Sequence, residues 1–309
     1  MRRYIVKRLL DGVITMWVVT LLVFLMLRIT GNPIDILSPP DFTHADRERL
    51  KKVYGLDKPI WEQYLLFNKS IFTGDFGQSL AFDNRDAFEM FLSRVPATLQ
   101  LTGAALMFAL TLGVTIGVIS AVKPDSIVDW VGKVLAISGQ SMPAFWLGLL
   151  FILLFSVHLG WLPSVGGIDR IGYKGLIMPA VSLGWYLVAA NMRIVRSSML
   201  EVLDSDYIKM VRGKGLPRRM VIWKHALRNA AIPVITLFFV SLAHLLSGAV
   251  ITETIFAWPG VGRLLVEAIF GRDYATVQVA VFFVSAGIVT VNILVDLIYA
   301  WLDPRVRIV

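Results

Sequence analysis

Long apolar segments alternate with shorter polar ones along nearly the whole of this chain. A helix of about 20 apolar residues is long enough to cross the hydrocarbon core of a bilayer, and each of these segments reaches that length or nearly so. The pattern therefore predicts an all-α membrane protein with six transmembrane helices. The segments are 9–27, 95–122, 134–168, 176–192, 233–251 and 274–301.

Two of these segments have internal features that modify the picture. The segment 134–168 is too long for one straight helix, and Pro143 in the run Ser141-Met142-Pro143 predicts a kink because proline lacks a backbone N–H. The segment 95–122 carries small residues, Gly113 and Gly117 among them, that allow a neighbouring helix to approach closely.

His244 is the one titratable residue of the segment 233–251. An ionisable residue inside a membrane span is a candidate for a functional role. The same segment offers no carboxylate partner, so we expect His244 to pack or to line a pore rather than to transfer protons.

The composition excludes several classes of protein. Of 309 residues 56% are hydrophobic and only 17% are charged, which a soluble domain of this size cannot accommodate. The absence of cysteine excludes disulfides, thiol catalysis and cysteine-based metal sites. The sequence also lacks the His-Glu-x-x-His and Gly-x-Ser-x-Gly motifs of hydrolases. We therefore expect no catalytic residues, no metal ligands and no cofactor bound by this chain.

The net charge of +8 is concentrated at the N-terminus and in the loop 204–233. Basic residues are retained on the cytoplasmic side during membrane insertion, so both termini and this loop are predicted to be cytoplasmic. In a membrane protein, the retention of basic residues in the cytoplasm and the docking of a partner protein explain these charges. We therefore expect no nucleic-acid partner. The polar region 31–94, with predicted helices at 46–54 and 59–70, is then external, either as a small cap or as a folded spacer.

The basic loop has signals of local structure. Asp204 or Ser205 can cap a helix over 207–214, and Gly215-Leu216-Pro217 predicts its end, followed by a second short helix from Pro217. Pro233 then marks the start of the next span. A solvated loop that only fixes orientation is the alternative. The run Gly213-Lys214-Gly215 lacks the rest of a phosphate-binding loop, so nucleotide binding by this chain is excluded.

This loop contains Asp206-Tyr207, then Lys214-Gly215-Leu216, and then His225-Ala226-Leu227-Arg228-Asn229-Ala230. These motifs resemble the cytoplasmic loop of ABC-importer permeases, and more narrowly that of the B-type subunit in the dipeptide/oligopeptide/nickel permease family. One departure is Lys209-Met210-Val211, where the wider superfamily has Glu-Ala-Ala. The resemblance implies an ATPase-coupling loop at about 197–230. Its coupling residues are then Asp206, Tyr207, Lys214, Gly215, Leu216, His225, Leu227, Arg228 and Asn229.

Further motifs in the same order extend this resemblance over nearly the whole chain. They lie at 55–64, 74–79, 141–143, 256–262 and 292–305. The resemblance implies a translocation path near Ser141, Met142 and Pro143, to which His244 is added as a candidate. Asp296 is expected to be tied to a partner helix or to the inner interface, because an unpaired buried carboxylate is unfavourable.

The resemblance implies a type I ABC importer permease fold in the bacterial inner membrane. The chain then consists of a cytoplasmic tip and first helix (1–30), an outer region (31–94) and a core of five transmembrane helices (95–309). Its expected partners are a second homologous permease, two ATPase subunits that bind ATP and Mg²⁺, and a periplasmic solute-binding protein.

The expected substrate is a di- or oligopeptide. A nickel chelate, glutathione or a glycoside is the alternative within the family, and a secondary transporter is the alternative from another class.

Overall fold

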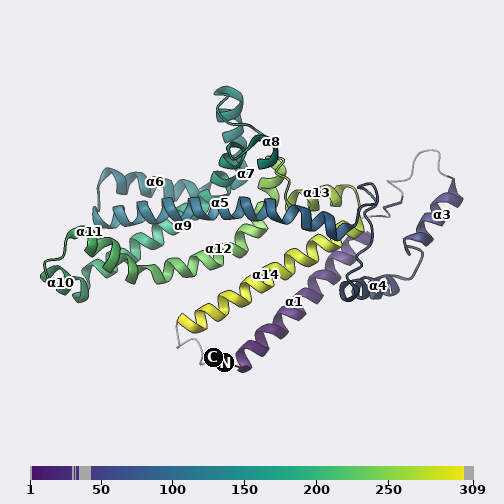
Figure 1. Ribbon diagram of the computed structural model, residues 1–309, viewed down its shortest axis with the longest axis horizontal. Coiled ribbons are helices and arrows are strands. Elements are labelled where there is room, and N and C mark those ends of the chain that lie inside the picture. The colour runs from purple at the N-terminus through teal and green to yellow at the C-terminus, as the bar shows by residue number, and fades with distance from the viewer. Residues whose placement is uncertain (1, 30, 32, 35–42, 303–309) are drawn as a thin grey trace. The chain divides into compact units, whose positions relative to one another are not determined.

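The computed structural model describes residues 2–29, 31, 33–34 and 43–302, and this part of the chain is built from helices (Figure 1). The helices are α1 (Arg2–Ile29), α3 (His44–Val53), α4 (Ile60–Thr73), α5 (Ala87–Val122), α6 (Ile127–Ser141), α7 (Ala144–Phe151), the π-helix η1 (Ile152–His158), α8 (Ile168–Ile171), α9 (Lys174–Asp204), α10 (Asp206–Gly213), α11 (Arg218–Met220), the π-helix η2 (Val221–Ala226), α12 (Leu227–Ile255), α13 (Val261–Phe270) and α14 (Tyr274–Leu302).

The helices group into two compact units. One unit comprises Met1–Thr98 together with Pro259–Val309, and the other comprises Leu99–Trp258. The long helix α5 belongs to both. The N-terminal and C-terminal parts of the chain therefore pack in one unit, although they are far apart in the sequence.

In the first unit, the helices α1 and α14 pack against each other. A Cβ atom at Gly12 would lie 2.8 Å from a side-chain carbon of Val289, so the two helices meet closely there. Arg8 of α1 also forms a salt bridge with Asp296 of α14, with Nε and Oδ2 2.9 Å apart. The expected pairing of Asp296 with a neighbouring helix is confirmed. The salt bridge connects the first predicted span to the last.

The outer region of the same unit contains the two predicted short helices, α3 and α4. Thr43 and Asp46 form a reciprocal capping box at the start of α3, and Gly74 ends α4 in the left-handed conformation that glycine favours. The buried carboxylate of Asp273 accepts hydrogen bonds from the hydroxyls of Ser79 and Thr276. The helix α5 begins at Ala87, eight residues before the predicted start at Val95, because the helix continues beyond the apolar run.

In the second unit, α9 is the central helix and packs against α6, α7 and α12. Small residues allow the close approach. A Cβ atom at Gly139 of α6 would lie 2.7 Å from Ala189 of α9. Most residues between Met178 and Met192 are accordingly buried, although α9 is less hydrophobic than the helices that surround it.

The chain changes direction at the predicted kink, Ser141-Met142-Pro143, but the bend between α6 and the helical segment that follows it is 108°. This is a break between two helices and not a kink within one. Pro143 is the N-cap of α7 and its backbone is extended, as is that of Met142, so the helix ends and a new one starts. The helix α6 also begins earlier than predicted, at Ile127, because the Ser126 hydroxyl caps it by accepting a bond from the Asp129 amide.

The helix that carries the predicted span from Pro233 begins before that residue. A continuous helical stretch runs from Arg218 through η2 into α12, and Pro233 lies inside it at a 57° bend. Proline can bend a helix rather than end it when flanking turns are held by tertiary contacts. With this bent pair and the pair α6–α7 each counted as one span, the described residues contain up to six candidate spans, in agreement with the predicted six.

We expect Gly117→Ala in α5 to destabilise the protein by about 1–3 kcal/mol, because its Cβ would lie 2.8 Å from both the Met192 carbonyl oxygen and the Val195 Cβ. Gly103 of the same helix has no atom within 4 Å of that position. Gly103→Ala is the matched control, expected to stabilise by about 0.5–1 kcal/mol. Thermal unfolding of both variants in detergent measures the difference, and equal effects would contradict the close contact.

Candidate functional site

The helix α10 follows α9 directly and has two different faces. Ser205 is its N-cap and accepts a hydrogen bond from the Ile208 amide, as the sequence predicts. Ile208 and Val211 are buried, whereas Tyr207 and Met210 are 42% and 53% exposed. The helix therefore holds to the protein by one face and presents an aromatic and a thioether side chain on the other.

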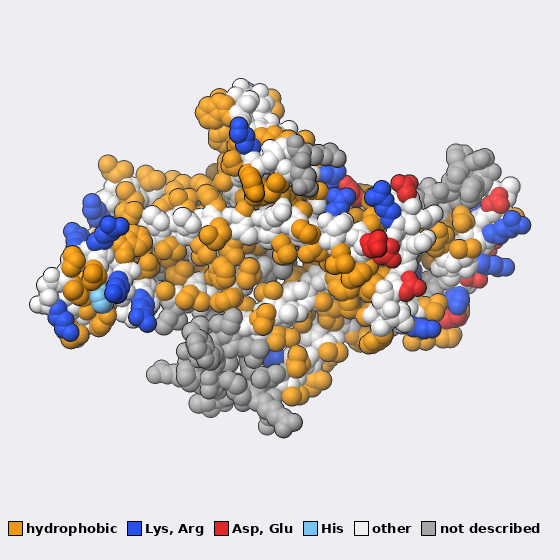
Figure 2. Space-filling model, viewed as in Figure 1, with side chains coloured by type: hydrophobic (Ala, Val, Ile, Leu, Met, Phe, Trp, Pro, Cys, Tyr) orange, Lys and Arg blue, Asp and Glu red, His pale blue; other side chains and the backbone are white. Residues whose placement is uncertain are grey.

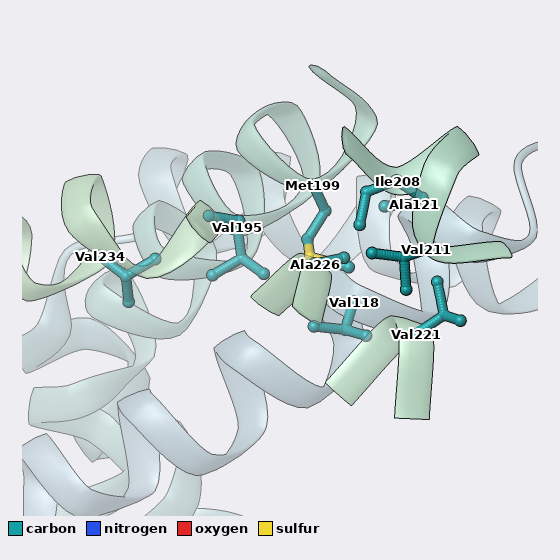
Figure 3. Close-up of a cluster of buried hydrophobic side chains, with 10 residues drawn as sticks. Val118, Ala121, Val195, Met199, Ile208, Val211, Val221, Ala226 and Val234 are labelled. Carbon is teal, nitrogen blue, oxygen red and sulfur yellow. The ribbon is translucent and has the colours of Figure 1, made fainter. Parts of the chain in front are cut away.

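The buried face of α10 belongs to a hydrophobic cluster with members from five elements. Figure 3 shows Met199, Ala226, Ile208 and Val211 close together, with Val234 at one end of the cluster. Burying a valine, isoleucine or methionine side chain stabilises by roughly 1.5–3 kcal/mol. Leu216 and Leu227, both predicted coupling residues, pack against this cluster. The cluster consists of Val118, Ala121, Val195, Met199, Ile208, Val211, Val221, Ala226, Ala230 and Val234.

The chain turns sharply after α10. Lys214 is the C-cap, and the amide of Gly215 donates to the Arg212 carbonyl at 3.0 Å. Gly215 has φ of +73°, a conformation that side chains with a Cβ adopt only with strain. The predicted break at Gly215 is confirmed, and its backbone conformation favours glycine even though the space around it is open.

The second arm of the loop returns through α11 and η2 and brings distant motif residues together. The Tyr207 hydroxyl and the His225 Nδ1 are 2.9 Å apart, a hydrogen bond across 18 positions. The side-chain amide of Asn229 donates a hydrogen bond to the His225 backbone carbonyl at 3.0 Å. A π-helix such as η2 is uncommon and is frequent at functional sites. Residues predicted separately from two motifs thus form one surface.

These residues surround a cavity of 670 Å³, here called the basic hollow. Its lining includes four of the predicted coupling residues, together with Lys224, which belongs to none of the predicted motif positions. Asp206, Lys214 and Gly215 do not line it, and Leu216 lines a separate hollow with Arg212 and Arg218. The basic hollow is lined by Val202, Ser205, Tyr207, Lys224, His225, Arg228 and Asn229.

The predicted path residues Ser141, Met142 and Pro143 are all exposed at the break between α6 and α7. The Ser141 hydroxyl donates to the Ile137 carbonyl at 3.0 Å. His244 lies in α12, but its side chain falls outside the described residues. The three-residue motif is therefore placed on an accessible surface of this chain, and its role in a path stays a prediction.

A buried ionic network joins α6 to α9 and was not predicted. The carboxylate of Asp129 is fully buried, and it accepts hydrogen bonds from Arg196 at 2.8 and 3.1 Å. Lys133 adds a salt bridge at 2.9 Å, and the amide of Asp125 donates at 3.0 Å. The i, i+4 spacing of Asp129 and Lys133 was the available signal, but only the fold shows that Arg196 reaches the same carboxylate.

Within the described ranges, no cluster of three or more histidine or acidic side chains is arranged to hold a metal ion.

Comparison with known proteins decides what kind of protein this is. Residues 113–308 match the family described as the binding-protein-dependent transport system inner membrane component, and residues 1–102 match the N-terminal model for the same kind of component. The chain belongs to this family. It is the permease of an ABC importer, located in the inner membrane with several membrane-spanning helices, and the secondary transporter considered from the sequence is excluded.

Several permeases resemble the chain over its full length. The di/tripeptide transport system permease protein DppB of Pseudomonas aeruginosa (strain UCBPP-PA14) is 40% identical over 338 residues, covering 99% of each chain. The dipeptide transport system permease protein DppB of Escherichia coli K12 is 40% identical over 337 residues, again covering 99% of each. The glutathione transport system permease protein GsiC of Pectobacterium atrosepticum is 38% identical over 308 residues, with 99% of each covered.

A solved structure supports the fold. A crystal structure of an amino acid ABC transporter with histidines superposes with a TM-score of 0.53 at 15% identity, covering 68% of this chain and 92% of that one. Together with the family match, this confirms the predicted type I permease fold.

Proposed function

We propose that this permease carries short peptides of two or three residues, delivered by a periplasmic binding protein. The support is that full-length relatives at 40% identity are named as dipeptide or di/tripeptide permeases. The chain forms one half of the translocation path, and a second, homologous permease forms the other. It performs no covalent chemistry, and nickel chelates and glycosides are weaker candidates than short peptides, which the relatives at 40% identity are named for.

Glutathione, itself a tripeptide, is the second candidate substrate. The alignment with the dipeptide permease spans 338 positions although this chain has 309 residues, so part of that relative has no counterpart here. The alignment with the glutathione permease spans 308 and needs no such gap. Identity favours the first substrate and length favours the second, and both are short peptides.

The coupling function is carried by the arrangement of α10. One face of this helix is locked into the core by Ile208 and Val211, while Tyr207 and Met210 project from the other. A rigidly held helix with exposed large side chains is suited to fill a groove on a partner. We assign this partner as an ATPase subunit, which binds ATP and Mg²⁺ itself, so that its closure moves α10 and the helices packed against it.

We expect substrate choice to follow the binding protein rather than the permease. The predicted spans carry few fixed charges, which gives a weakly selective passage. Uptake of labelled dipeptides and of glutathione is measured after the cognate binding protein is exchanged for that of a related system. Uptake that keeps the original range after the exchange would place selectivity in the permease instead.

We expect both termini and the loop 204–233 to be cytoplasmic and the region 31–94 to be periplasmic. The chain has no cysteine, so single cysteines can be labelled without background. Asp57→Cys should react with an impermeant maleimide added from outside, and Lys214→Cys only after the membrane is opened. Labelling of the two variants from the same side would overturn the topology.

A further inference from the structure

The basic hollow carries positive charge that this chain does not neutralise. Lys224 and Arg228 are exposed on its wall, and His225 lies between them. Neither Lys224 nor Arg228 has a carboxylate within salt-bridge distance among the described residues. None of the seven lining residues is acidic.

Nearby acidic side chains do not supply the missing charge. Asp206 is paired with Lys209 at 3.1 Å, and neither of these residues lines the basic hollow. Glu201 and Asp204 are exposed on α9 and also lie outside the lining. Figure 2 shows the same imbalance: Lys and Arg gather at the end of the molecule where α10 and α11 lie, without Asp or Glu on the visible face there.

The local fold keeps the two cations on one wall. Lys224 lies in η2 and Arg228 four residues later in α12, so both point to the same side of a continuous helix. Tyr207 also lines the hollow, and its hydroxyl is hydrogen bonded to His225. Ala226, which lies between Lys224 and Arg228 in the sequence, is fully buried in the hydrophobic cluster. This packing prevents the helix from rotating about its axis, so Lys224 and Arg228 stay on the hollow.

From this geometry we infer that the basic hollow receives an acidic side chain of the ATPase subunit, with its carboxylate bound by Lys224 and Arg228. The inference rests on the proposed coupling function and gives it a second contact beside the exposed face of α10. A guanidinium binds a carboxylate through two parallel hydrogen bonds, which fixes orientation as well as position. The ATPase is the favoured source because the hollow adjoins Tyr207, which also belongs to the exposed face of α10.

The test compares two charge reversals in the assembled transporter. Arg228→Glu reverses a charge in the basic hollow. Arg219→Glu is the matched control, because Arg219 is an exposed arginine of the same loop that lines neither hollow. Permeases and ATPases are purified together in nanodiscs, and ATPase dissociation is followed against salt concentration. We expect Arg228→Glu to weaken ATPase binding by about tenfold or more at low salt and Arg219→Glu to have a small effect.

The direct evidence is a rescue. Each carboxylate near the docking groove of the ATPase is changed to lysine in turn, and one of these changes should restore binding to the Arg228→Glu permease. Equal effects of the two permease variants, or no rescue by any reversal, would overturn the inference. An effect that appears in discs containing phosphatidylglycerol and vanishes in phosphatidylcholine alone would assign the hollow to a lipid headgroup and overturn it as well.

The same preparation separates this inference from the coupling proposal. If the wild-type permease did not hold the ATPase through α10, Tyr207→Ala and Met210→Ala would leave ATPase binding unchanged. If only the inferred acidic contact were absent, those two variants would still weaken binding while Arg228→Glu would not.

Discussion

Gly215→Val is expected to abolish peptide uptake while the permease still inserts normally into the membrane. Gly215 has φ of +73°, and a residue with a Cβ there is strained by about 1–3 kcal/mol, more with a β-branched side chain. Strain of that size shifts the population of the native turn by roughly 5–150-fold. The turn positions α10 against η2, so its loss displaces the exposed face of α10. The membrane spans do not depend on this turn for their backbone hydrogen bonds.

The measurements are transport by the reconstituted complex and hydrolysis of ATP stimulated by loaded binding protein. Gly213 provides the matched control. It lies at the end of α10 without positive φ and, like Gly215, has no atom within 4 Å of an added Cβ. Gly215→Ala should therefore lower stimulated hydrolysis, and Gly213→Ala should not. Normal stimulation in Gly215→Val would make this glycine an ordinary loop residue.

Arg196→Met is expected to lower the stability of the permease by about 3 kcal/mol. Among the described residues, it leaves the fully buried carboxylate of Asp129 with Lys133 and one backbone amide as partners. Removing one partner of a buried ion pair typically destabilises by about 3–5 kcal/mol, and the partial exposure of Arg196, at 26%, favours the lower end. Thermal unfolding in detergent, followed by tryptophan fluorescence, should show a melting temperature lower by roughly 6–12 °C.

Two further variants test whether the loss of stability comes from the buried Asp129 carboxylate that is left without Arg196. Lys133→Met removes a side chain that is 40% exposed and makes a single bond to Asp129, so we expect a loss of about 1 kcal/mol or less. Asp129→Asn combined with Arg196→Met removes both charges and keeps the acceptor for the Asp125 amide. This double variant should be more stable than Arg196→Met alone. A double variant that is the less stable of the two would show that packing by Arg196, not its charge, matters.

The elements themselves follow closely from the sequence. The apolar segments were long enough to define the spans, because the cost of an unpaired backbone group in a bilayer leaves an uninterrupted helix as the simplest solution. The break at Gly215 was also readable, because glycine followed by proline ends a helix for local steric reasons. The continuation of the helix on the N-terminal side of Pro233 was not readable, because local sterics alone do not decide whether a proline bends a helix or ends it.

What local patterns could not supply is which elements meet. The sequence by itself determined an all-helical membrane protein, its candidate spans and the position of its basic loop along the chain, since hydropathy and backbone sterics act over short stretches. Only the tertiary structure brought Tyr207 to His225, Arg8 to Asp296 and Arg196 to Asp129. Each of these pairs joins residues far apart in the chain, and their meeting depends on how whole helices pack, which the spacing of residues within any one helix does not encode.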